Sequence, residues 1–214
     1  MKKVIPIDPV NPDPVVLSSL GDVIRKGGII AFPTDTFYGL AVNPFDPEAV
    51  ARLYALKGRD PLKPILLLVS SMEMFQPLVA EIPPLAKRVM ARFWPGPLTL
   101  VLKGSRELPD VLMAGTEKIG IRFPDGTLPI RLIEAVGLPL TATSANPSGS
   151  RHPPGSAADV EGMLPMGIDH ILDGGPSCLP IPSTVLDVSE SEPHILREGR
   201  ISAKTLEKAL GIRF

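Results

Sequence analysis

Short apolar runs alternate along this chain with segments whose apolar residues recur at helical spacing. The runs predict strands, and the segments between them predict helices. Residues 29–32 and 65–69 are compact apolar runs bounded by glycine, proline or serine, as expected of buried strands. Asp13 and Asp46 each precede a proline and then apolar residues at helical spacing, which is the pattern of a capped helix start. The same criteria predict further strands at residues 98–102, 118–123, 138–143, 170–172, 184–188 and 194–196, and further helices beginning near Pro84, Leu128, Ser156 and Ser202.

This interleaving of strands and helices places the chain in the α/β class. One stretch without predicted structure, residues 146–155, is rich in proline, glycine and serine. At about ten residues it is more typical of a loop at a site than of a hinge between domains. Since no internal repeat or linker stands out, we expect one domain over residues 1–214.

Composition and charge narrow the class of protein. Hydrophobic residues make up 44% and charged residues 21% of the 214 residues, both near ordinary globular usage, which argues against a disordered chain. Lys and Arg number 22 against 23 Asp and Glu, and this balance argues against a surface that coats nucleic acid but leaves room for a local basic patch. The single cysteine, Cys178, excludes an internal disulfide framework and a multi-cysteine zinc site.

Membrane and export signals are not expected. The apolar runs are too short to span a bilayer, and Asp8 follows the basic start at Lys2 and Lys3 too early for a signal peptide. We therefore expect a cytoplasmic protein with no membrane partner.

Several common catalytic patterns do not occur in the sequence. There is no G-x-x-x-x-G-K-[ST], no G-x-G-x-x-G and no G-x-S-x-G. A P-loop, an ordinary dinucleotide fingerprint and a serine nucleophile elbow are therefore not predicted.

Polar residues follow the predicted strand at 29–32. Thr34, Asp35 and Thr36 come almost directly after it, where polar side chains are well placed to line a pocket. Hydroxyls can donate and accept, which suits a small polar ligand. A capped turn, in which Asp35 accepts bonds from backbone N–H groups, explains the same residues equally well.

Three cations, Lys57, Arg59 and Lys63, fall within seven residues at the end of the helix that follows Asp46. Cations at a helix C-terminus stabilise the helix through its macrodipole, and a solvated basic loop is common. The functional alternative is a phosphate clamp, with a planar fork from arginine and mobile charges from lysine. Taken alone, the segment favours the solvated basic loop over the phosphate clamp.

Arg122 lies within an apolar strand, where an unpaired guanidinium would be very costly to bury. It needs an anion nearby, either an internal carboxylate or a carboxylate or phosphate of a ligand. Small polar residues at 141–149 form an ordinary turn or let a ligand approach the backbone. Ser183 and Arg197 fit the same pattern, although a surface pair with Glu198 also explains Arg197. If these strand ends meet, the cleft suits a small zwitterion beside a polyphosphate.

Seven segments, in this order, resemble the YrdC family of threonylcarbamoyl-adenylate synthases over roughly residues 15–202. They are P-T-D-T-x-Y-G-L at 33–40, K-x-R at 57–59 with K-P at 63–64, W-P-G-P-x-T at 94–99, I-R-x-P at 121–124, S-A-N-x-S-G at 144–149, S-T-V at 183–185 and L-R-x-G at 196–199.

The resemblance implies an α/β fold built on an open twisted mixed sheet, with flanking helices and a large concave cavity, in the family's short single-domain form. It implies an enzyme that uses L-threonine, bicarbonate or carbon dioxide, and ATP, and that releases pyrophosphate with threonylcarbamoyl-AMP. Separate partner proteins would then pass the threonylcarbamoyl group to a tRNA adenosine. Mg²⁺ would be bound through the ATP phosphates, so a chain without a metal motif fits this chemistry.

The resemblance also implies residue roles. No catalytic side chain is implied, because positioning and charge stabilisation account for this kind of transfer. The chain departs from the family at Leu68, where some relatives have histidine, at Lys118, where threonine is common, and at Thr143, where proline is usual. Threonine binding is implied for Thr34, Thr36, Arg122, Ala142 and Ser183, and ATP binding for Lys57, Arg59, Lys63, Ser144, Asn146 and Arg197.

Two other functions are compatible with parts of the sequence. An RNA-binding ribosome or translation maturation factor without adenylate chemistry would use the basic segment 52–63, although overall neutrality and few aromatic residues speak against it. A related carbamoyl-adenylate domain would use carbamoyl phosphate, but the zinc-finger and acylphosphatase-like modules of those relatives do not occur in this sequence.

Overall fold

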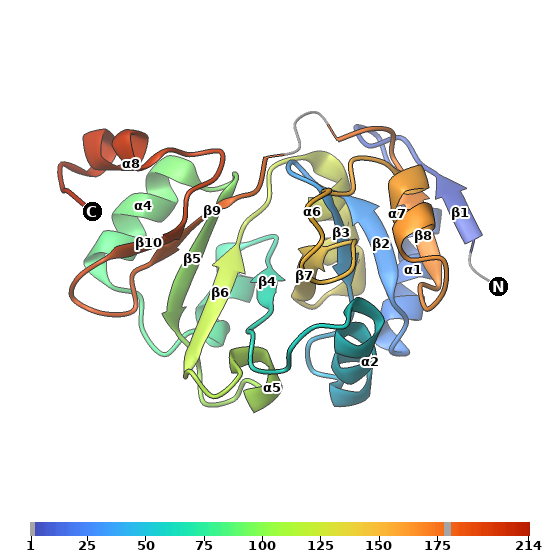
Figure 1. The fold of residues 1–214 in the computed structure, drawn as a ribbon, viewed down its shortest axis with the longest axis horizontal. Coiled ribbons are helices and arrows are strands. Elements are labelled where there is room, and N and C mark those ends of the chain that lie inside the picture. Colours follow the sequence, from blue (N-terminus) through green and yellow to red (C-terminus); the bar gives the residue numbers. More distant parts are fainter. Residues whose placement is uncertain (1–2, 178–180) are drawn as a thin grey trace.

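The computed structural model describes residues 3–177 and 181–214 (Figure 1). Cys178 and the start of the chain at Met1 and Lys2 lie outside the described residues. The strands are β1 (Lys3–Pro6), β2 (Ile30–Pro33), β3 (Tyr38–Ala41), β4 (Leu66–Leu68), β5 (Leu98–Lys103), β6 (Lys118–Arg122), β7 (Leu140–Ser144), β8 (His170–Asp173), β9 (Thr184–Asp187) and β10 (His194–Arg197). The helices are α1 (Pro14–Arg25), α2 (Pro47–Lys57), α3 (Met72–Phe75), the 3₁₀ helix η1 (Gln76–Leu78), α4 (Pro84–Phe93), α5 (Asp110–Met113), α6 (Thr127–Val136), α7 (Ala157–Met163) and α8 (Ala203–Leu210).

All ten described strands belong to one sheet, in the order β1-β8-β2-β3-β7-β4-β6-β5-β9-β10. Parallel pairs such as β4 with β6 and β5 with β9 occur beside antiparallel pairs such as β2 with β3 and β5 with β6. Figure 1 shows the strands spread from β1 at one end of the molecule to β10 at the other. The predicted α/β fold on an open twisted mixed sheet is therefore confirmed.

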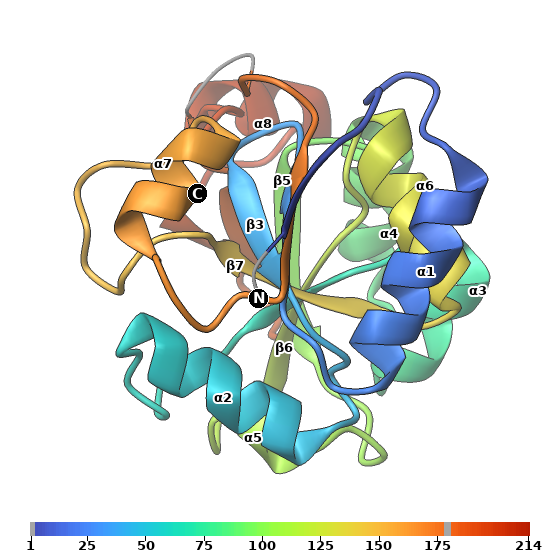
Figure 2. The same cartoon turned by 90° about the vertical axis from the view of Figure 1, so that its right-hand side faces the viewer.

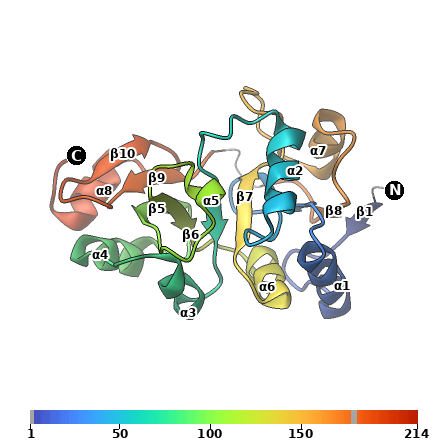
Figure 3. The same cartoon turned by 90° about the horizontal axis from the view of Figure 1, so that it is seen from below.

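Helices cover the sheet from both sides. Figure 3 shows α1, α3, α4 and α6 along one face, with α2 and α7 on the other, and Figure 2 shows α1 lying beside α6. Gly21 permits this close approach, because a Cβ there would lie 2.9 Å from the Ala135 carbonyl oxygen. Arg25 Nη1 donates to the Ala135 and Val136 carbonyls, at 3.0 and 2.9 Å, and so satisfies the end of α6. Within residues 3–177 and 181–214, no helix combines the length and apolar content needed to cross a bilayer.

Apolar side chains pack against the sheet in two clusters. The larger includes Leu100, Ile119 and Ile121, and the smaller, which includes Ile24 and Leu132, joins α1 and α6 to the sheet. Because strand side chains alternate between faces, the neighbours of the buried β5 and β6 residues point the other way. That other face is where the polar residues of the sheet gather.

The elements that the apolar pattern predicts are present, with ends displaced by one or two residues. The pattern does not predict β1, β3, α3 or α5. No strand is predicted at residues 38–40, whereas the structure pairs them with β2 in an antiparallel hairpin. Gly39 weakens the strand signal there, since glycine is depleted in strands. The hairpin holds residues 34–37 as its turn, and the Thr34 N–H donates to the Phe37 carbonyl at 3.1 Å.

Candidate ligand-binding site

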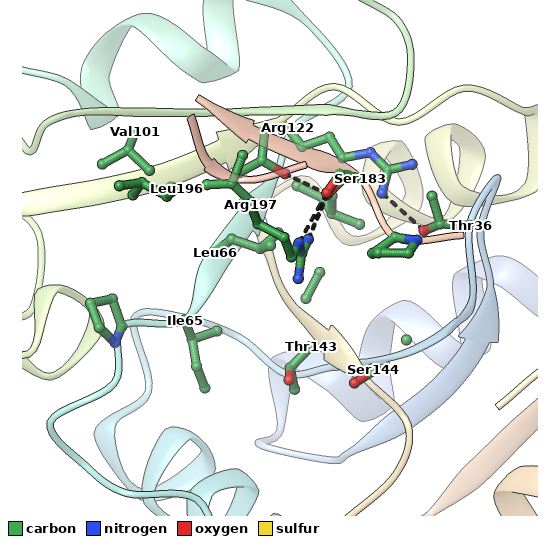
Figure 4. Close-up of a pocket in the computed structure, with 18 of the residues that line it drawn as sticks. Thr36, Ile65, Leu66, Val101, Arg122, Thr143, Ser144, Ser183, Leu196 and Arg197 are labelled. Atoms are coloured by element: carbon green, nitrogen blue, oxygen red, sulfur yellow. Dashed lines mark hydrogen bonds between the residues drawn. The ribbon is translucent and has the colours of Figure 1, made fainter. Parts of the chain in front are cut away.

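A cavity of about 490 Å³ lies over the sheet, within the size range of small-molecule sites. Its wall comes from β3, β4, β5, β6, β7, β9 and β10 and from the loops beside them, so residues far apart in sequence meet there (Figure 4). Most residues with an implied role are part of this wall: Thr34, Thr36, Arg59, Arg122, Ala142, Ser144, Ser183 and Arg197. Lys57, Lys63 and Asn146 are not among the lining residues.

Strand β6 shows how the sheet builds this wall. Lys118, Gly120 and Arg122 line the cavity, while Ile119 and Ile121 between them are fully buried in the apolar core. A Cβ on Gly120 would lie 3.3 Å from Leu66 Cβ. Because glycine has no side chain, the cavity stays open above the middle of β6. On its cavity face the strand therefore carries one cation near each end and no side chain between them.

Arg122 is buried, with 5% of its surface exposed. Its Nε donates to the Gly96 carbonyl at 3.0 Å, its Nη1 to Thr36 Oγ1 at 3.1 Å, and its Nη2 pairs with the Asp35 carboxylate. Burial lowers the pKa of Arg122, and the charge of Asp35 opposes that shift. The sequence predicts an anion beside Arg122 without identifying it. In the structure this anion is the internal carboxylate of Asp35. Because guanidinium has five N–H groups, two are left over once these described partners are satisfied.

Asp35 lies at the hairpin turn and is held from two sides. Arg122 pairs with one of its carboxylate oxygens, and Arg200 Nη1 donates to its backbone carbonyl at 3.0 Å. The other carboxylate oxygen, Oδ2, is buried and has no hydrogen-bond partner among the described residues. The paired oxygen of Asp35 therefore binds Arg122 and does not cap backbone N–H groups of the turn.

Thr34 and Thr36 share a hydrogen bond, with 3.1 Å between their hydroxyl oxygens. Thr34 Oγ1 also donates to the Phe37 carbonyl at 2.7 Å, and Thr36 accepts from Arg122. Both residues line the cavity. The turn thus presents two preoriented hydroxyl groups next to a buried guanidinium.

Ser183 is the centre of a second polar group, which Figure 4 shows beside Arg197. Its hydroxyl lies 2.9 Å from Thr99 Oγ1. Arg197 Nη2 donates to the Ser183 carbonyl at 2.8 Å and to its hydroxyl at 3.1 Å. Burial lowers the pKa of Arg197, and the positive charge of Arg122 adds to that effect. The side chain of Arg197 therefore faces the cavity and is bonded there.

Lys57 is buried at the C-terminal end of α2, with 3% of its surface exposed. Its ammonium donates to the backbone carbonyls of Ser144 and Asn146, the latter at 2.6 Å. Burial lowers the pKa of Lys57 to about 7, and the charge of Arg59 contributes. Ser144 Oγ in turn donates to Asn146 Oδ1 at 2.6 Å, so the three residues form one network at the end of β7.

Arg59 and Lys63 take different positions in the loop after α2. Arg59 lines the cavity, and its Nε and Nη2 donate to the Lys63 and Pro64 carbonyls at 3.2 and 2.8 Å. Lys63 is exposed. The basic segment thus divides into a buried cation, a cation in the cavity wall and a solvated one.

Sequence reasoning assigned no ligand role to Lys118 or Asp187. Both line the cavity and form an ion pair of 3.0 Å. Burial alone would raise the pKa of the Asp187 carboxyl, but hydrogen bonds from Ser189 and the pair with Lys118 keep it below its ordinary value. In the sequence, only the lysine at position 118, where threonine is common in the family, could have drawn attention to this ion pair.

This fold and cavity define an α/β protein with a site for a small polar ligand, built from hydroxyls, arginines and the partly exposed Lys118–Asp187 ion pair. Comparison with known proteins narrows the class. The sequence profile of the Sua5/YciO/YrdC family, described as "Telomere recombination", matches residues 22–199. The chain belongs to this family.

Similar proteins agree with this assignment. A Pyrococcus abyssi protein named threonylcarbamoyl-AMP synthase is 40% identical over 191 residues, covering 88% of this chain and 55% of the relative. A Bacillus subtilis protein of the same name is 36% identical over 211 residues, covering 95% and 59%. The crystal structure of P. abyssi Sua5 complexed with L-threonine matches with a TM-score of 0.92 and 36% identity, covering all of this chain and 62% of that one. The chain thus spans less than two thirds of the length of these relatives.

Proposed function

We propose that this chain is a nucleotidyltransferase that makes threonylcarbamoyl-AMP and pyrophosphate from L-threonine, bicarbonate or carbon dioxide, and ATP. The observation that carries the proposal is Arg122, a buried guanidinium in a cavity wall, with hydroxyl groups beside it and two N–H groups left over. That arrangement suits a zwitterion with a hydroxyl side chain. Relatives named threonylcarbamoyl-AMP synthase, and a similar structure that holds L-threonine, support the choice of threonine.

In this proposal the threonine carboxylate takes the two remaining N–H groups of Arg122. Its hydroxyl meets Thr34, Thr36 or Ser183, and Ala142 lines the same wall. Residues 34 and 36 belong to one turn, whereas Ser183 approaches from β9, so the ligand is held from two directions. The amine is left pointing into the cavity, where bicarbonate or carbon dioxide would react with it.

Arg59 and Arg197 line the cavity and would neutralise the ATP phosphates, beside Ser144. Lys57, Lys63 and Asn146 stay predicted ATP ligands. In this conformation the Lys57 ammonium donates to the carbonyls of Ser144, which lines the cavity, and of Asn146, which does not.

The reaction needs no side-chain nucleophile. The neutral threonine nitrogen forms a bond to the carbon of carbon dioxide and loses a proton, which gives a carbamate. When bicarbonate is the source, its C–OH bond breaks and water leaves with that proton. A carbamate oxygen then bonds to the α-phosphorus of ATP while the bond to pyrophosphate breaks. Holding the reactants in line is worth on the order of 7–11 kcal/mol of the barrier, and the arginines stabilise the charge that moves onto the leaving group.

Magnesium belongs to the substrate in this proposal. Among the described residues no group of three or more His, Cys, Asp or Glu could hold a metal ion. Mg²⁺ ordinarily binds nucleotide phosphates and keeps several waters, so it needs few protein ligands. The product would pass to separate proteins that modify tRNA in the cytoplasm.

The test is pyrophosphate release with ATP and magnesium, leaving out threonine and bicarbonate in turn. Release that needs both substrates is the expected result. Valine should be rejected about 10⁴-fold, because it lacks the hydroxyl, and serine only about 10–200-fold, because it lacks one methyl group. Pyrophosphate release that is independent of threonine, or equal turnover of valine, would contradict the proposal.

The RNA-binding alternative has no observation in its favour. In the basic segment 52–63, the Lys57 charge is buried and Arg59 bonds its own loop. Arg52 donates to the Gly27 carbonyl at 3.0 Å. The segment therefore does not present its cations together on one surface.

A further inference from the structure

The positive charge of Arg122 is already balanced inside the protein. Its Nη2 pairs with the Asp35 carboxylate, and the side chains of the two residues are 6% and 10% exposed. In the proposed function the ligand carboxylate takes the remaining N–H groups of the same guanidinium. A second carboxylate beside a neutral pair gains little net attraction, because the first carboxylate repels it. The threonine end of the cavity therefore needs a further positive charge.

Arg200 places such a charge beside the pair. It lies in the segment between β10 and α8, and its Nη1 donates to the backbone carbonyl of Asp35 at 3.0 Å. Burial is the largest cause that lowers the pKa of Arg122, and the positive charge of Arg200 lowers it further. Arg200 has no carboxylate partner among the described ion pairs, so no such partner cancels its charge.

The backbone that carries Arg200 is fixed to the sheet. The Arg200 N–H donates to the Pro182 carbonyl at 2.9 Å. On either side of it, Gly199 and Ile201 donate their N–H groups to Thr184 Oγ1, at 3.0 and 3.1 Å. Thr184 is fully buried in β9. A Cβ on Gly199 would overlap the Pro182 carbonyl oxygen, so only glycine fits this close approach. The backbone of Arg200 therefore has a fixed place beside the β2–β3 turn.

The charges around Arg122 leave one positive charge in excess. Asp35 and the exposed Asp125 are negative, and both oppose the lowering of the Arg122 pKa. Burial and then the charge of Arg122 lower the pKa of Arg197, so this cation belongs to the same group. Arg122, Arg197 and Arg200 thus face two carboxylates. Because the proposed function assigns Arg197 to the ATP phosphates, Arg200 is the cation left for the carboxylate of threonine.

We propose that Arg200 selects a ligand with a carboxylate at the threonine end of the cavity, by replacing the positive charge of Arg122 that Asp35 neutralises. Arg200 does not line the cavity and acts on the ligand through its charge. Its bond to the Asp35 carbonyl holds that charge in place. This inference rests on the proposed function, which supplies threonine as the ligand. The resemblance leaves Arg200 without a role, because the L-R-x-G segment ends at residue 199.

The test compares the binding of L-threonine and of L-threoninamide to the full chain by calorimetry. The amide keeps the hydroxyl and amino groups of threonine but has no carboxylate charge. Arg200→Met should bind threonine about tenfold more weakly than the wild type, the effect of one charge roughly 12 Å away at an effective dielectric constant of about 20. It should bind threoninamide at least as tightly as the wild type does. Arg200→Lys should restore most of the threonine affinity, because lysine keeps the charge.

Arg200→Gln separates the charge from the hydrogen bond, since glutamine is neutral and still has N–H groups to donate. It should bind threonine as weakly as Arg200→Met does, and it replaces that variant in the test if Arg200→Met does not fold. Arg106→Met is the matched control, because Arg106 is an exposed arginine that does not line the cavity. It should bind both ligands as the wild type does. Thermal unfolding of each variant shows whether it is folded.

The outcomes distinguish the role of Arg200 from the proposed function. If Arg200→Met binds threonine as the wild type does, or weakens threonine and threoninamide by the same factor, Arg200 does not select the carboxylate while the proposed function stands. Wild-type threonine affinity in Arg200→Gln would show that the hydrogen bond matters and the charge does not, which also overturns the inference. If the wild type binds no threonine, the proposed function is wrong and the role of Arg200 falls with it.

Discussion

Arg122 draws its partners from separate segments of the chain. Gly96 precedes β5, while Asp35 and Thr36 lie in the β2–β3 turn, and all three bond the same guanidinium. Loss of that side chain would release both segments and leave the Asp35 carboxylate buried without a counter-charge. An unpaired buried charge is far more costly than a missing pair.

A double-mutant cycle should show this asymmetry. Arg122→Met should lower the free energy of unfolding by about 3–5 kcal/mol, because it leaves the buried Asp35 charge alone. Adding Asp35→Asn should restore part of that loss. Urea unfolding of the wild type, both single variants and the double variant measures the cycle.

Arg131→Met provides the control for that cycle, since Arg131 forms an exposed pair with Glu134 at 2.9 Å. Exposed pairs contribute about 0–1 kcal/mol. If the double variant loses the sum of the two single losses, Arg122 and Asp35 do not stabilise each other.

The pKa of Lys57, lowered to about 7 by burial and by Arg59, predicts a pH dependence of stability. Above that pH the unfolded chain binds a proton that the folded chain has released, because a free lysine titrates near 10.5. Stability therefore rises with pH between these two values, by at most about 1.4 kcal/mol per pH unit. Below the lower value both states are protonated and the slope disappears.

Urea unfolding of the wild type and of Lys57→Met at several pH values above 7 checks this prediction. The difference in stability between them should change with pH in favour of the wild type, because methionine has no proton to release. Lys87→Met is the control, since Lys87 is exposed. A Lys57→Met profile parallel to that of the wild type would mean that the Lys57 pKa is ordinary.

Among the elements, β6 forms a stretch of the cavity wall with alternate residues. It carries Arg122 at one end and Lys118 at the other, and Gly120 between them adds no side chain to the wall. Its core-facing residues, Ile119 and Ile121, are fully buried. The apolar face of the strand thus packs in the core. Its other face has no side chain at Gly120, which leaves space for a ligand to lie along the strand.

Gly120→Val should close the cavity with little effect on strand formation, since valine favours strands. Its Cβ would lie 3.3 Å from Leu66 Cβ and 3.4 Å from Thr99 Cγ2, so the branched side chain would project between them into the cavity. Binding of threonine and of ATP should both weaken by more than about tenfold. Calorimetry measures both.

Gly162→Ala is the matched control, because a Cβ there meets nothing within 4 Å and the residue lies in α7, away from the cavity wall. It should bind as the wild type does. Wild-type affinity in Gly120→Val would show that ligands do not cross the middle of β6.

The elements themselves were largely predictable from apolar spacing and caps. Asp13 and Asp46 cap α1 and α2 with their side chains, as their position before a proline predicts. β3 was hidden by its glycine and by the polar turn before it. α3 and α5 are each four residues long, too short for a helical period to appear in the sequence.

Several residues that line the cavity could be selected from the sequence, but the bonds between them could not. The sequence marked Arg122 as a cation in need of an anion, yet nothing in it selects Asp35, because the pairing depends on the β2–β3 hairpin. Lys57 was marked by its charge, but its burial follows from how α2 packs beside the end of β7. Asp187 has no motif of its own, and only the register of β9 on β5 brings it to Lys118.

At the scale of the whole molecule, the cavity joins two halves of one sheet. β4 pairs with β7 at the join, between β1-β8-β2-β3 on one side and β6-β5-β9-β10 on the other. Thr36 belongs to the first half and Ser183 approaches from the second. A ligand that bonds both therefore links the halves directly.

Threonine with ATP should raise the stability of the entire fold in a single transition. A ligand at about 100 times its Kd adds about 2.7 kcal/mol, which corresponds to roughly 5–10 °C in Tm for a chain of this size. Differential scanning calorimetry measures the shift, and Gly120→Val at the same ligand concentrations should show a smaller one, since a tenfold loss of affinity leaves about 1.4 kcal/mol of stabilisation. Two separated transitions, with only one moved by ligand, would mean that the halves unfold independently.

The strand order also has a consequence for the chain while it is being synthesised. β8 lies between β1 and β2 and pairs in parallel with both, so β1 has no place in the sheet until residue 173 has been made. β5 likewise keeps an open edge until β9 follows near residue 187. Open strand edges are sites of wrong pairing between chains. The growing polypeptide must therefore keep two such edges apart from its neighbours on the ribosome until most of its length has emerged.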